Sequence, residues 1–291
     1  MKNKFTIEKP MPPLWMMYPH ISRFSIGWRM GYGEGYKWEL SDWLDTLSDV
    51  DRLRYREMFP APKAWRNYYN KDYDFEDMEE YEVEHIQLWN KHGEMQYSRS
   101  KLIEQYNRTG KLDAVFFWKP NDDIIDKSCL GQWQYSEFTV DIDDYYYAEQ
   151  YMMAEKAHLF NDKEILLKIM ESKDPKEMKA LGKKVRNFNQ ELWDKAKYAI
   201  VLNANYFKFS QNKAMRDFLL NTGDKILVEA SPLDTIWGIG LGEENEKSHN
   251  PNLWRGQNLL GFALMEVRDD LRNIYRNYDR VAWEQLSGHS E

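Results

Sequence analysis

The chain has 291 residues, of which 42% are hydrophobic and 15% aromatic, so it can bury a core as one large domain or two modest ones. Its net charge of −8 argues against strong non-specific binding to duplex nucleic acid, which needs an excess of Lys and Arg over a broad surface. A single cysteine, Cys129, excludes an internal disulfide, and no stretch approaches the length of an uncharged apolar membrane span. Because the N-terminal segment lacks the apolar run of a signal peptide, we expect a globular, cytoplasmic protein without a membrane partner.

The first part of the chain differs from the rest in its residue pattern. This difference predicts an accessory N-terminal domain of unknown role, residues 1–110. It opens with an aromatic, Gly-punctuated stretch, and a helix then begins after Ser48, which can cap its first turn. An acid-rich run over 72–84 becomes amphipathic and predicts a helix with a solvated acidic start. The turn signal "NRTGK" places the boundary near Gly110, and residues 111–291 form the second domain.

The second domain is predicted to be mainly α-helical with a few short strands, an α+β arrangement. Asp162 and the pair Asp174-Pro175 are good helix starts, and Gly223 is a suitable stop. The predicted helices cover residues 148–160, 163–171, 175–184, 190–208 and 213–221, with a long amphipathic helix from about Asn258. The predicted strands are "LDAVFFW" (112–118), "FTV" (138–140) and "KILVEA" (225–230).

Several sequence motifs lack the spacing that a nucleotide-binding, zinc-binding or cysteine-based catalytic site requires. The stretches "MGYGEGY" and "WGIGLG" resemble glycine fingerprints, but neither follows a strand and opens a helix, so we expect no dinucleotide fold. His85 and His92 lack the i, i+4 spacing or nearby cysteines of a zinc site. Cys129 has no histidine close in sequence and is interpreted as a buried thiol. We therefore expect neither a metal nor a cofactor.

The stretch "YYYAEQYMMAEKAHLF" seats charges among apolar side chains. On a helix, Glu149, Met152, Lys156 and Phe160 share one side because they follow the i, i+3, i+4, i+7 rule. Burying a carboxylate and an ammonium there is costly unless they pair, shift their pKa values or take part in chemistry. The residues alone leave two interpretations open, a structural salt link and a catalytic site.

Four segments, taken in order, carry a family resemblance. They are "CLGQWQYSEFTVDIDDYYYAEQYMMAEKA" (129–157), "LGKKVRNFNQELWDKAKYAIVLNANYFKFSQN" (181–212), "LLNTGDKILVEASPLDTIWGIGL" (219–241) and "LWRGQNLLGFALMEVRDDL" (253–271). Together they resemble the NADAR family, also called YbiA-like. Its hallmarks are a Glu-(His/Gln)-Tyr-(Met/Phe) helix, a Trp after an "LG" helix, a "KF..N" stretch, "LVE...D..WG" and a final "G.N.LG..LM..R". The resemblance covers roughly residues 112–275, and nothing is carried onto the first 110.

The resemblance implies a multihelical catalytic domain that acts as an N-glycosidase on ribosylated nitrogens. Members of the family hydrolyse ribosylamino pyrimidine phosphates of riboflavin synthesis or remove ADP-ribose from guanine. For this chain we favour ADP-ribosyl-guanine, in a nucleotide or in single-stranded nucleic acid, because a basic segment suits a diphosphate. A module that binds ADP-ribose without cleaving it is the alternative from another functional class.

The same motifs imply the site residues. The implied catalytic residues are Glu149, Trp193 and Asp234, with Lys156 as a further candidate. The family commonly has Ser where this chain has Gly131, so no side-chain contact is expected there. The residues expected to bind substrate are Gln132, Trp133, Met152, Trp237, Gly238 and Asn258.

The chemistry explains why such residue types are needed. Cleaving the C1′–N bond of a riboside builds positive charge on the sugar, which a carboxylate such as Glu149 can stabilise. Asp234 is a natural second acid for proton transfer, although the roles of the two acids stay open. Lys156 can bind a phosphate, hold Glu149 ionised, form a Schiff base with a ring-opened ribose, or make only a salt bridge. Trp193 offers a stacking face for a planar base.

A basic cluster surrounds Trp193 in an otherwise acidic chain. Its residues are either a solvated helix face or a binding surface for a phosphate-bearing ligand. The members are Lys173, Lys176, Lys179, Lys183, Lys184 and Arg186.

Overall fold

The computed structural model describes residues 5–70 and 95–286. The predicted acidic helix from 72, with His85 and His92, lies outside these residues. The chain divides into two compact units, and helix α5 (Arg99–Thr109), which precedes Gly110, belongs to the second of them. The first unit comprises the chain up to 77 with 139–143 and 270–291, and the second comprises 78–138 and 144–269.

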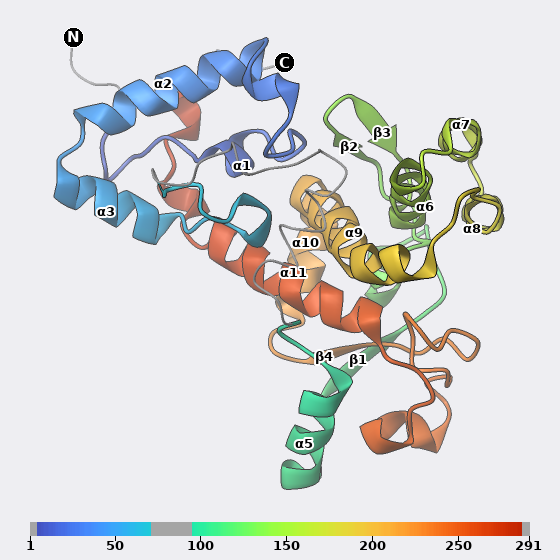
Figure 1. The fold of residues 1–291 in the computed structure, drawn as a ribbon. Coiled ribbons are helices and arrows are strands. Elements are labelled where there is room, and N and C mark those ends of the chain that lie inside the picture. The colour runs from blue at the N-terminus through green and yellow to red at the C-terminus, as the bar shows by residue number, and fades with distance from the viewer. Residues whose placement is uncertain (1–4, 71–94, 287–291) are drawn as a thin grey trace. The chain divides into compact units, whose positions relative to one another are not determined.

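The first unit contains α1 (Leu14–Met17), α2 (Tyr32–Thr46) and α3 (Asp49–Met58), shown in blue in Figure 1. The predicted cap is confirmed, because the Ser48 side chain accepts a hydrogen bond from the backbone N–H of Asp51. The core of the first unit is strongly aromatic, as the many aromatic residues near the start of the sequence indicate. Buried rings include Trp15, Trp28, Tyr36, Trp43, Tyr55 and Trp65.

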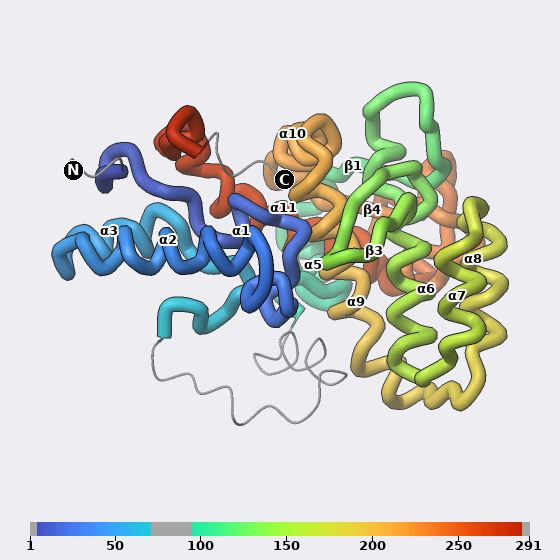
Figure 2. Tube along the Cα trace, turned by 90° about the horizontal axis from the view of Figure 1, so that it is seen from above, coloured from blue at the N-terminus to red at the C-terminus, as the bar shows by residue number. Residues whose placement is uncertain are grey.

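The second unit is mainly helical, as predicted. Helices α7 (Lys163–Glu171) and α10 (Lys213–Asn221) have the same first and last residues as predicted. Helix α9 (Gln190–Gln211) continues three residues beyond its predicted end. Helix α6 packs against α7, α8 and α9, and Figure 2 shows α6, α7 and α8 side by side. The helices are α5 (Arg99–Thr109), α6 (Ala148–Leu159), α7 (Lys163–Glu171), α8 (Pro175–Gly182), α9 (Gln190–Gln211), α10 (Lys213–Asn221) and α11 (Leu259–Tyr275), the last of which runs on into the first unit.

Two pairs of short strands complete the fold. The predicted strands at 112–118 and 225–230 are confirmed as β1 (Ala114–Phe117) and β4 (Ile226–Glu229), which pair in parallel with Ala114 opposite Ile226. Helix α11 approaches this pair so closely that a Cβ at Gly261 would lie 2.0 Å from the carbonyl oxygen of Leu227. A second pair joins β2 (Phe138–Val140), which was predicted, to β3 (Asp143–Tyr145), which was not.

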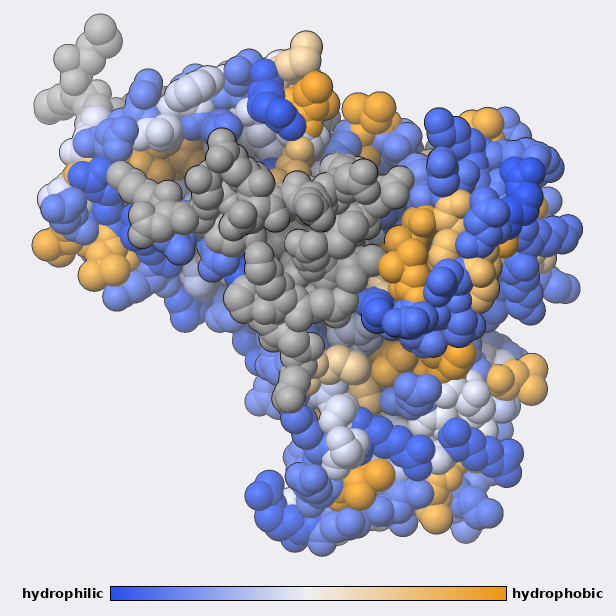
Figure 3. Space-filling view, viewed as in Figure 1, coloured by the Kyte–Doolittle hydropathy of each residue, from blue (hydrophilic) through white to orange (hydrophobic). Residues whose placement is uncertain are grey.

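The helix starts follow the capping chemistry. Asp162 and Asp174 accept hydrogen bonds from the first turns of α7 and α8, and Pro175 occupies the first position of α8. On the face drawn in Figure 3, hydrophilic residues predominate and the hydrophobic ones form small separate patches. Across the described ranges, no helix combines the length and apolarity needed to cross a membrane.

Candidate functional site

Glu149 occupies the first turn of α6 and is buried, with 3% of its surface exposed. Its backbone N–H donates to the carbonyl oxygen of Gln132 at 3.1 Å, which joins the helix start to the preceding loop. Side-chain atom Oε1 has no hydrogen-bond partner among the described residues. An unsatisfied buried acceptor is costly, and a donor group of a bound ligand would satisfy it.

The electrostatic surroundings of Glu149 favour its neutral form more than water does. Burial raises the pKa of Glu149 from 4.5 to about 7, and the negative charge of Asp234 acts in the same direction. The ammonium of Lys179 and a hydrogen bond from the Trp133 indole oppose the rise. A carboxyl whose pKa lies near neutrality is well suited to act as an acid or a base.

Glu229 is a second carboxyl group near Glu149, half-buried as a residue, and it was not expected as a site residue from the sequence. It is the last residue of β4, and its Oε2 lacks both solvent contact and a hydrogen-bond partner within the part of the chain that is described. Burial raises its pKa to about 8, with further rises from Asp234 and Glu149 and an opposing effect from Lys179. The sequence feature that could have identified Glu229 is its place in the family motif "LVE...D..WG".

Asn258 positions the end of β4. Its side chain is fully buried, accepts a hydrogen bond from the N–H of Glu229 at 3.0 Å, and donates one to the carbonyl oxygen of Leu227 at 2.9 Å. Both amide atoms are therefore used by the strand. Asn258, which the family motif predicts to bind substrate, supports Glu229 in this structure.

Asp234 lies in the loop after β4. Its Oδ1 accepts hydrogen bonds from the backbone N–H groups of Ile236 and Trp237 at 2.9 and 2.8 Å, which shapes the turn. Its Oδ2 lies 3.8 Å from Nζ of Lys179. The ring of Trp237 is buried, and a Cβ at Gly238 would lie 2.8 Å from the carbonyl oxygen of Glu229, so Gly238 allows the loop to approach the strand.

Lys179, on α8, is the cation that these three carboxyl groups share. Its Nζ also lies 5.7 Å from the centroid of the Trp133 ring, a cation–π arrangement. The approach of α8 to α6 depends on Gly182, where a Cβ would lie 2.0 Å from Sδ of Met153. A glycine one turn beyond Lys179 thus lets α8 approach the helix that carries Glu149.

Gln132 adds a third unsatisfied acceptor. Its Nε2 lies 3.4 Å from Sδ of Met152, one helical turn after Glu149, and its Oε1 has no partner among the residues described. The loop that carries Gln132 is held by the buried ammonium of Lys208, which donates to the carbonyl oxygen of Gly131 at 2.8 Å. Burial lowers the pKa of Lys208 to about 8.

Lys156 and Trp193 form a neighbouring cluster further along α6. Nζ of Lys156 lies 5.2 Å from the centroid of the Trp193 ring and 4.4 Å from that of Phe188. Burial lowers the pKa of Lys156. Within the described ranges, no ion pair joins Lys156 to Glu149, so the salt link that the sequence left open is not formed. Seven residues of helix separate the two by about 10 Å along the axis.

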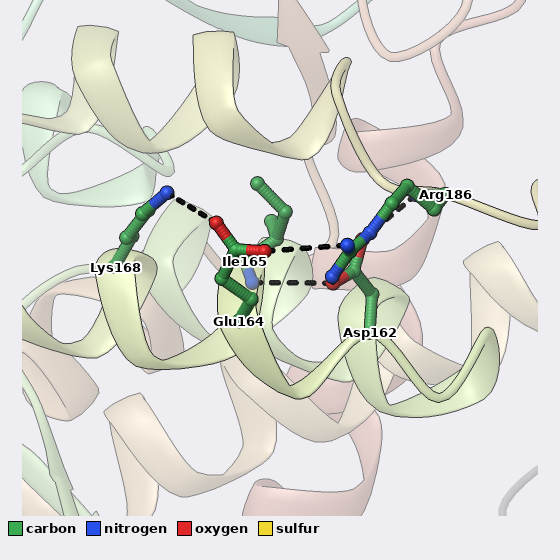
Figure 4. Close-up of polar contacts among 5 residues, drawn as sticks. All are labelled: Asp162, Glu164, Ile165, Lys168 and Arg186. Carbon is green, nitrogen blue, oxygen red and sulfur yellow. Dashed lines mark hydrogen bonds and ion pairs between the residues drawn. The ribbon is translucent and has the colours of Figure 1, made fainter.

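Arg186 departs from the expected basic cluster, as Figure 4 shows. Its backbone N–H and guanidinium donate to the buried carboxylate of Asp162, and its Nη1 lies 3.2 Å from a carboxylate oxygen of Glu164. These hydrogen bonds hold the pKa of Asp162 below its ordinary value. Arg186 therefore fastens the chain after α8 to the start of α7, and Lys179 is the cluster member at the carboxyl groups.

The single cysteine has little support as a nucleophile at this site. Cys129 is buried, and burial raises the pKa of its thiol to about 11, which disfavours the nucleophilic thiolate. Outside the undescribed segments, no group of three or more His, Cys, Asp or Glu side chains is arranged to hold a metal ion.

Comparison with known proteins gives a consistent family. The NADAR domain matches residues 116–272. N-glycosidase R617 of Acanthamoeba polyphaga mimivirus is 44% identical over 161 residues, which are 54% of this chain and 95% of that protein. N-glycosidase Npun_R5314 of Nostoc punctiforme is 34% identical, covering 48% of this chain and 84% of the relative. The maize riboflavin biosynthesis protein PYRR is 29% identical, covering 45% of this chain and 19% of the relative.

Proposed function

Since the chain belongs to the NADAR domain family, we propose that it is an N-glycoside hydrolase that cleaves a ribosyl C1′–N bond. Its relatives named N-glycosidases support this class of reaction. In the proposed reaction the C1′–N bond breaks and water forms the new C1′–O bond, keeping one of its protons as the C1′ hydroxyl. The other proton of the water goes to a carboxylate, and a protonated carboxyl group donates a proton to the leaving nitrogen.

One observation carries the proposal. Three buried oxygens, on Gln132, Glu149 and Glu229, have no hydrogen-bond donor among the described residues and belong to neighbouring residues. Other atoms in this condition, such as Trp15 Nε1 and Asn205 Oδ1, are not part of this group. Buried acceptors without donors are rare in folded proteins, because each loses its hydrogen bonds to water. Ribose hydroxyls and the N–H groups of a base are donors of the type that would satisfy them. A substrate rich in such groups therefore fits the site better than an apolar one.

The two carboxyl groups with raised pKa values, those of Glu149 and Glu229, suit different roles. Glu149 acts in its ionised form, because a carboxylate beside C1′ stabilises the developing sugar cation and can accept a proton from water. Glu229, whose pKa lies at about 8, stays protonated at neutral pH and can donate to the leaving nitrogen. Asp234 uses Oδ1 to shape its turn and places Oδ2 near Lys179, so it orients the shared cation.

We favour ADP-ribosyl-guanine as the substrate. Lys156 lies about 10 Å along α6 from Glu149, and its Nζ lies over the Trp193 ring, so a ligand longer than one riboside could contact both clusters. A cation beside aromatic rings suits a phosphate next to a base. The ribosylamino pyrimidine phosphates are the second candidate, supported by the similarity to PYRR.

A product assay separates these candidates. The purified chain is incubated with a single-stranded oligonucleotide carrying ADP-ribosyl-guanine and, separately, with a ribosylamino pyrimidine phosphate, and released products are measured by mass spectrometry. We expect free ADP-ribose and unmodified guanine from the first. Release from the second alone would transfer the proposal to the riboflavin intermediates. Tight ADP-ribose binding in calorimetry, without turnover of either substrate, would identify a binding module instead.

A further inference from the structure

The first unit contains a cavity that the proposed reaction does not use. Its volume is about 190 Å³, and three aromatic side chains, Trp28, Trp65 and Tyr68, form much of its wall. Pockets for drug-sized ligands are larger, roughly 300–1,000 Å³. This cavity therefore suits a single planar ring system, with any attached group at its rim. The remaining lining residues are Leu14, Arg23, Lys37, Asn67 and Asn70.

The charged residues that line the cavity are all positive. They are Arg23 and Lys37, and no acid lines the cavity among the residues that the structure describes, although the chain as a whole carries a net charge of −8. Lys37 is exposed on α2 and has no carboxylate partner within the described residues. An exposed cation at the rim of an aromatic cavity favours an anionic ligand.

The walls are fixed before any ligand binds. The indole N–H of Trp28 donates to the carbonyl oxygen of Ser22 at 2.8 Å, and the guanidinium of Arg23 donates to the carbonyl oxygen of Arg66. The rings of Trp28 and Trp65 pack edge to face, with centroids 5.6 Å apart. Asn67, another residue that lines the cavity, adopts a left-handed backbone conformation with φ of 61°. Such preorganisation lowers the entropy that binding must overcome.

We propose that this cavity binds one nucleotide, with the base against the aromatic wall and the phosphate at Arg23 and Lys37. Aromatic side chains with adjacent cations are the usual means of holding a base and its phosphate without reading a long sequence. The amides of Asn67 and Asn70 carry both donors and acceptors and can meet the edge of a base. The ligand is either a free nucleotide or one nucleotide of a single strand, since both present the same groups.

The test uses the full chain and a pair of matched charge reversals. Lys37→Glu places an acid at the cavity, whereas Lys9→Glu makes the same change at an exposed lysine of the first unit that does not line it. Binding of GMP, guanosine, ribose 5-phosphate and a short 5′-phosphorylated oligonucleotide is measured by equilibrium dialysis. Melting curves confirm that both variants are folded.

We expect Lys37→Glu to weaken GMP binding at least about tenfold and Lys9→Glu to leave it unchanged. Guanosine and ribose 5-phosphate should both bind more weakly than GMP, because each lacks one half of the recognised group. If the oligonucleotide binds more tightly than GMP, the natural ligand is a strand. Equal affinity of the two variants for GMP, or no GMP binding at millimolar concentration, would overturn the proposal. Hydrolysis is not measured, so the result is independent of the proposed reaction.

Discussion

Nζ of Lys179 lies 3.8 Å from Oδ2 of Asp234, and the same ammonium lowers the pKa values of Glu149 and Glu229. Removing its charge should raise both values further. We expect the acidic limb of the pH–rate profile of Lys179→Gln to move to higher pH, so that activity falls more at pH 6.5 than at pH 8. Lys176→Gln, an exposed lysine on the same helix, is the control. An unchanged acidic limb would show that Lys179 does not tune the carboxyl groups.

Glu229→Gln tests the assignment of the proton donor. Gln keeps the shape and hydrogen-bonding reach of the protonated acid but cannot release a proton. We expect turnover to fall by roughly 10²–10⁴, the range typical of a positioned general acid, and the alkaline limb of the pH–rate profile to disappear. Exposed Glu171→Gln should have no such effect.

The leaving group gives an independent readout of Glu229. An N-ribosyl pyridinium substrate loses its base as a neutral molecule and needs no proton. Its hydrolysis should therefore be nearly insensitive to Glu229→Gln. A loss as large as that seen with ADP-ribosyl-guanine would indicate that Glu229 supports the fold or binds substrate, and does not donate the proton.

Lys156→Met tests the second cluster. The lysine has its Nζ over Phe188 and Trp193, and its lowered pKa increases the fraction of neutral amine. We expect turnover to fall in Lys156→Met. If the amine forms a Schiff base with a ring-opened ribose, borohydride should trap a covalent adduct in the wild-type protein alone. Failure to trap any adduct, with a raised KM in the variant, would favour a phosphate contact.

Gly182→Ala tests the close approach of α8 to α6. The added Cβ would meet Sδ of Met153, so the helices must move apart. We expect a loss of about 1–3 kcal/mol in the free energy of unfolding, as in other overpacked cores, together with reduced turnover. Met153→Ala in the same chain should recover part of both. Gly35→Ala is the matched control in α2, because no atom lies within 4 Å of its added Cβ.

Local chemistry explains which parts of the fold could be predicted from the sequence. Helices α7 and α8 begin at Asp162 and Asp174 because these side chains cap their own first turns. The parallel pairing of β1 with β4 has no such local signal, since a long stretch of chain separates the strands. For the same reason "ILVE" was read as an ordinary strand, although the fold shields a carboxyl oxygen of its last residue, Glu229, from solvent.

In the candidate site, too, features with a local sequence signal could be predicted, and features that depend on contacts between distant segments could not. The unusual burial of the Glu149 charge could be predicted from one helix, whereas its proposed catalytic role came from the family resemblance. Lys179 could not be separated from the other lysines of its basic segment, because its approach to the carboxyl groups depends on the α6–α8 contact at Gly182. Arg186 looked like a further phosphate contact, but its partner Asp162 lies at the start of another helix.

The stability of the protein should report the burial of Glu149. Its pKa is raised from 4.5 to about 7, so the folded state holds the proton more tightly than the unfolded state. The stability that this provides is present below pH 4.5 and is lost as the pH rises toward 7. Glu149→Gln avoids that loss. We expect the variant to exceed the wild type in stability at pH 8, by on the order of 2–3 kcal/mol, and the difference to shrink at pH 5.

The most direct test of the proposed catalytic site is the hydrolysis rate of Glu149→Gln on the substrate that the wild-type protein turns over, measured beside its thermal unfolding at pH 8. Gln keeps the shape of the side chain and removes the charge that would stabilise the sugar cation. We expect a rate at least about a hundredfold below wild type in a protein that is equally or more stable. A rate near that of the wild type, or a loss of activity that follows only a loss of folded protein, would contradict the catalytic assignment.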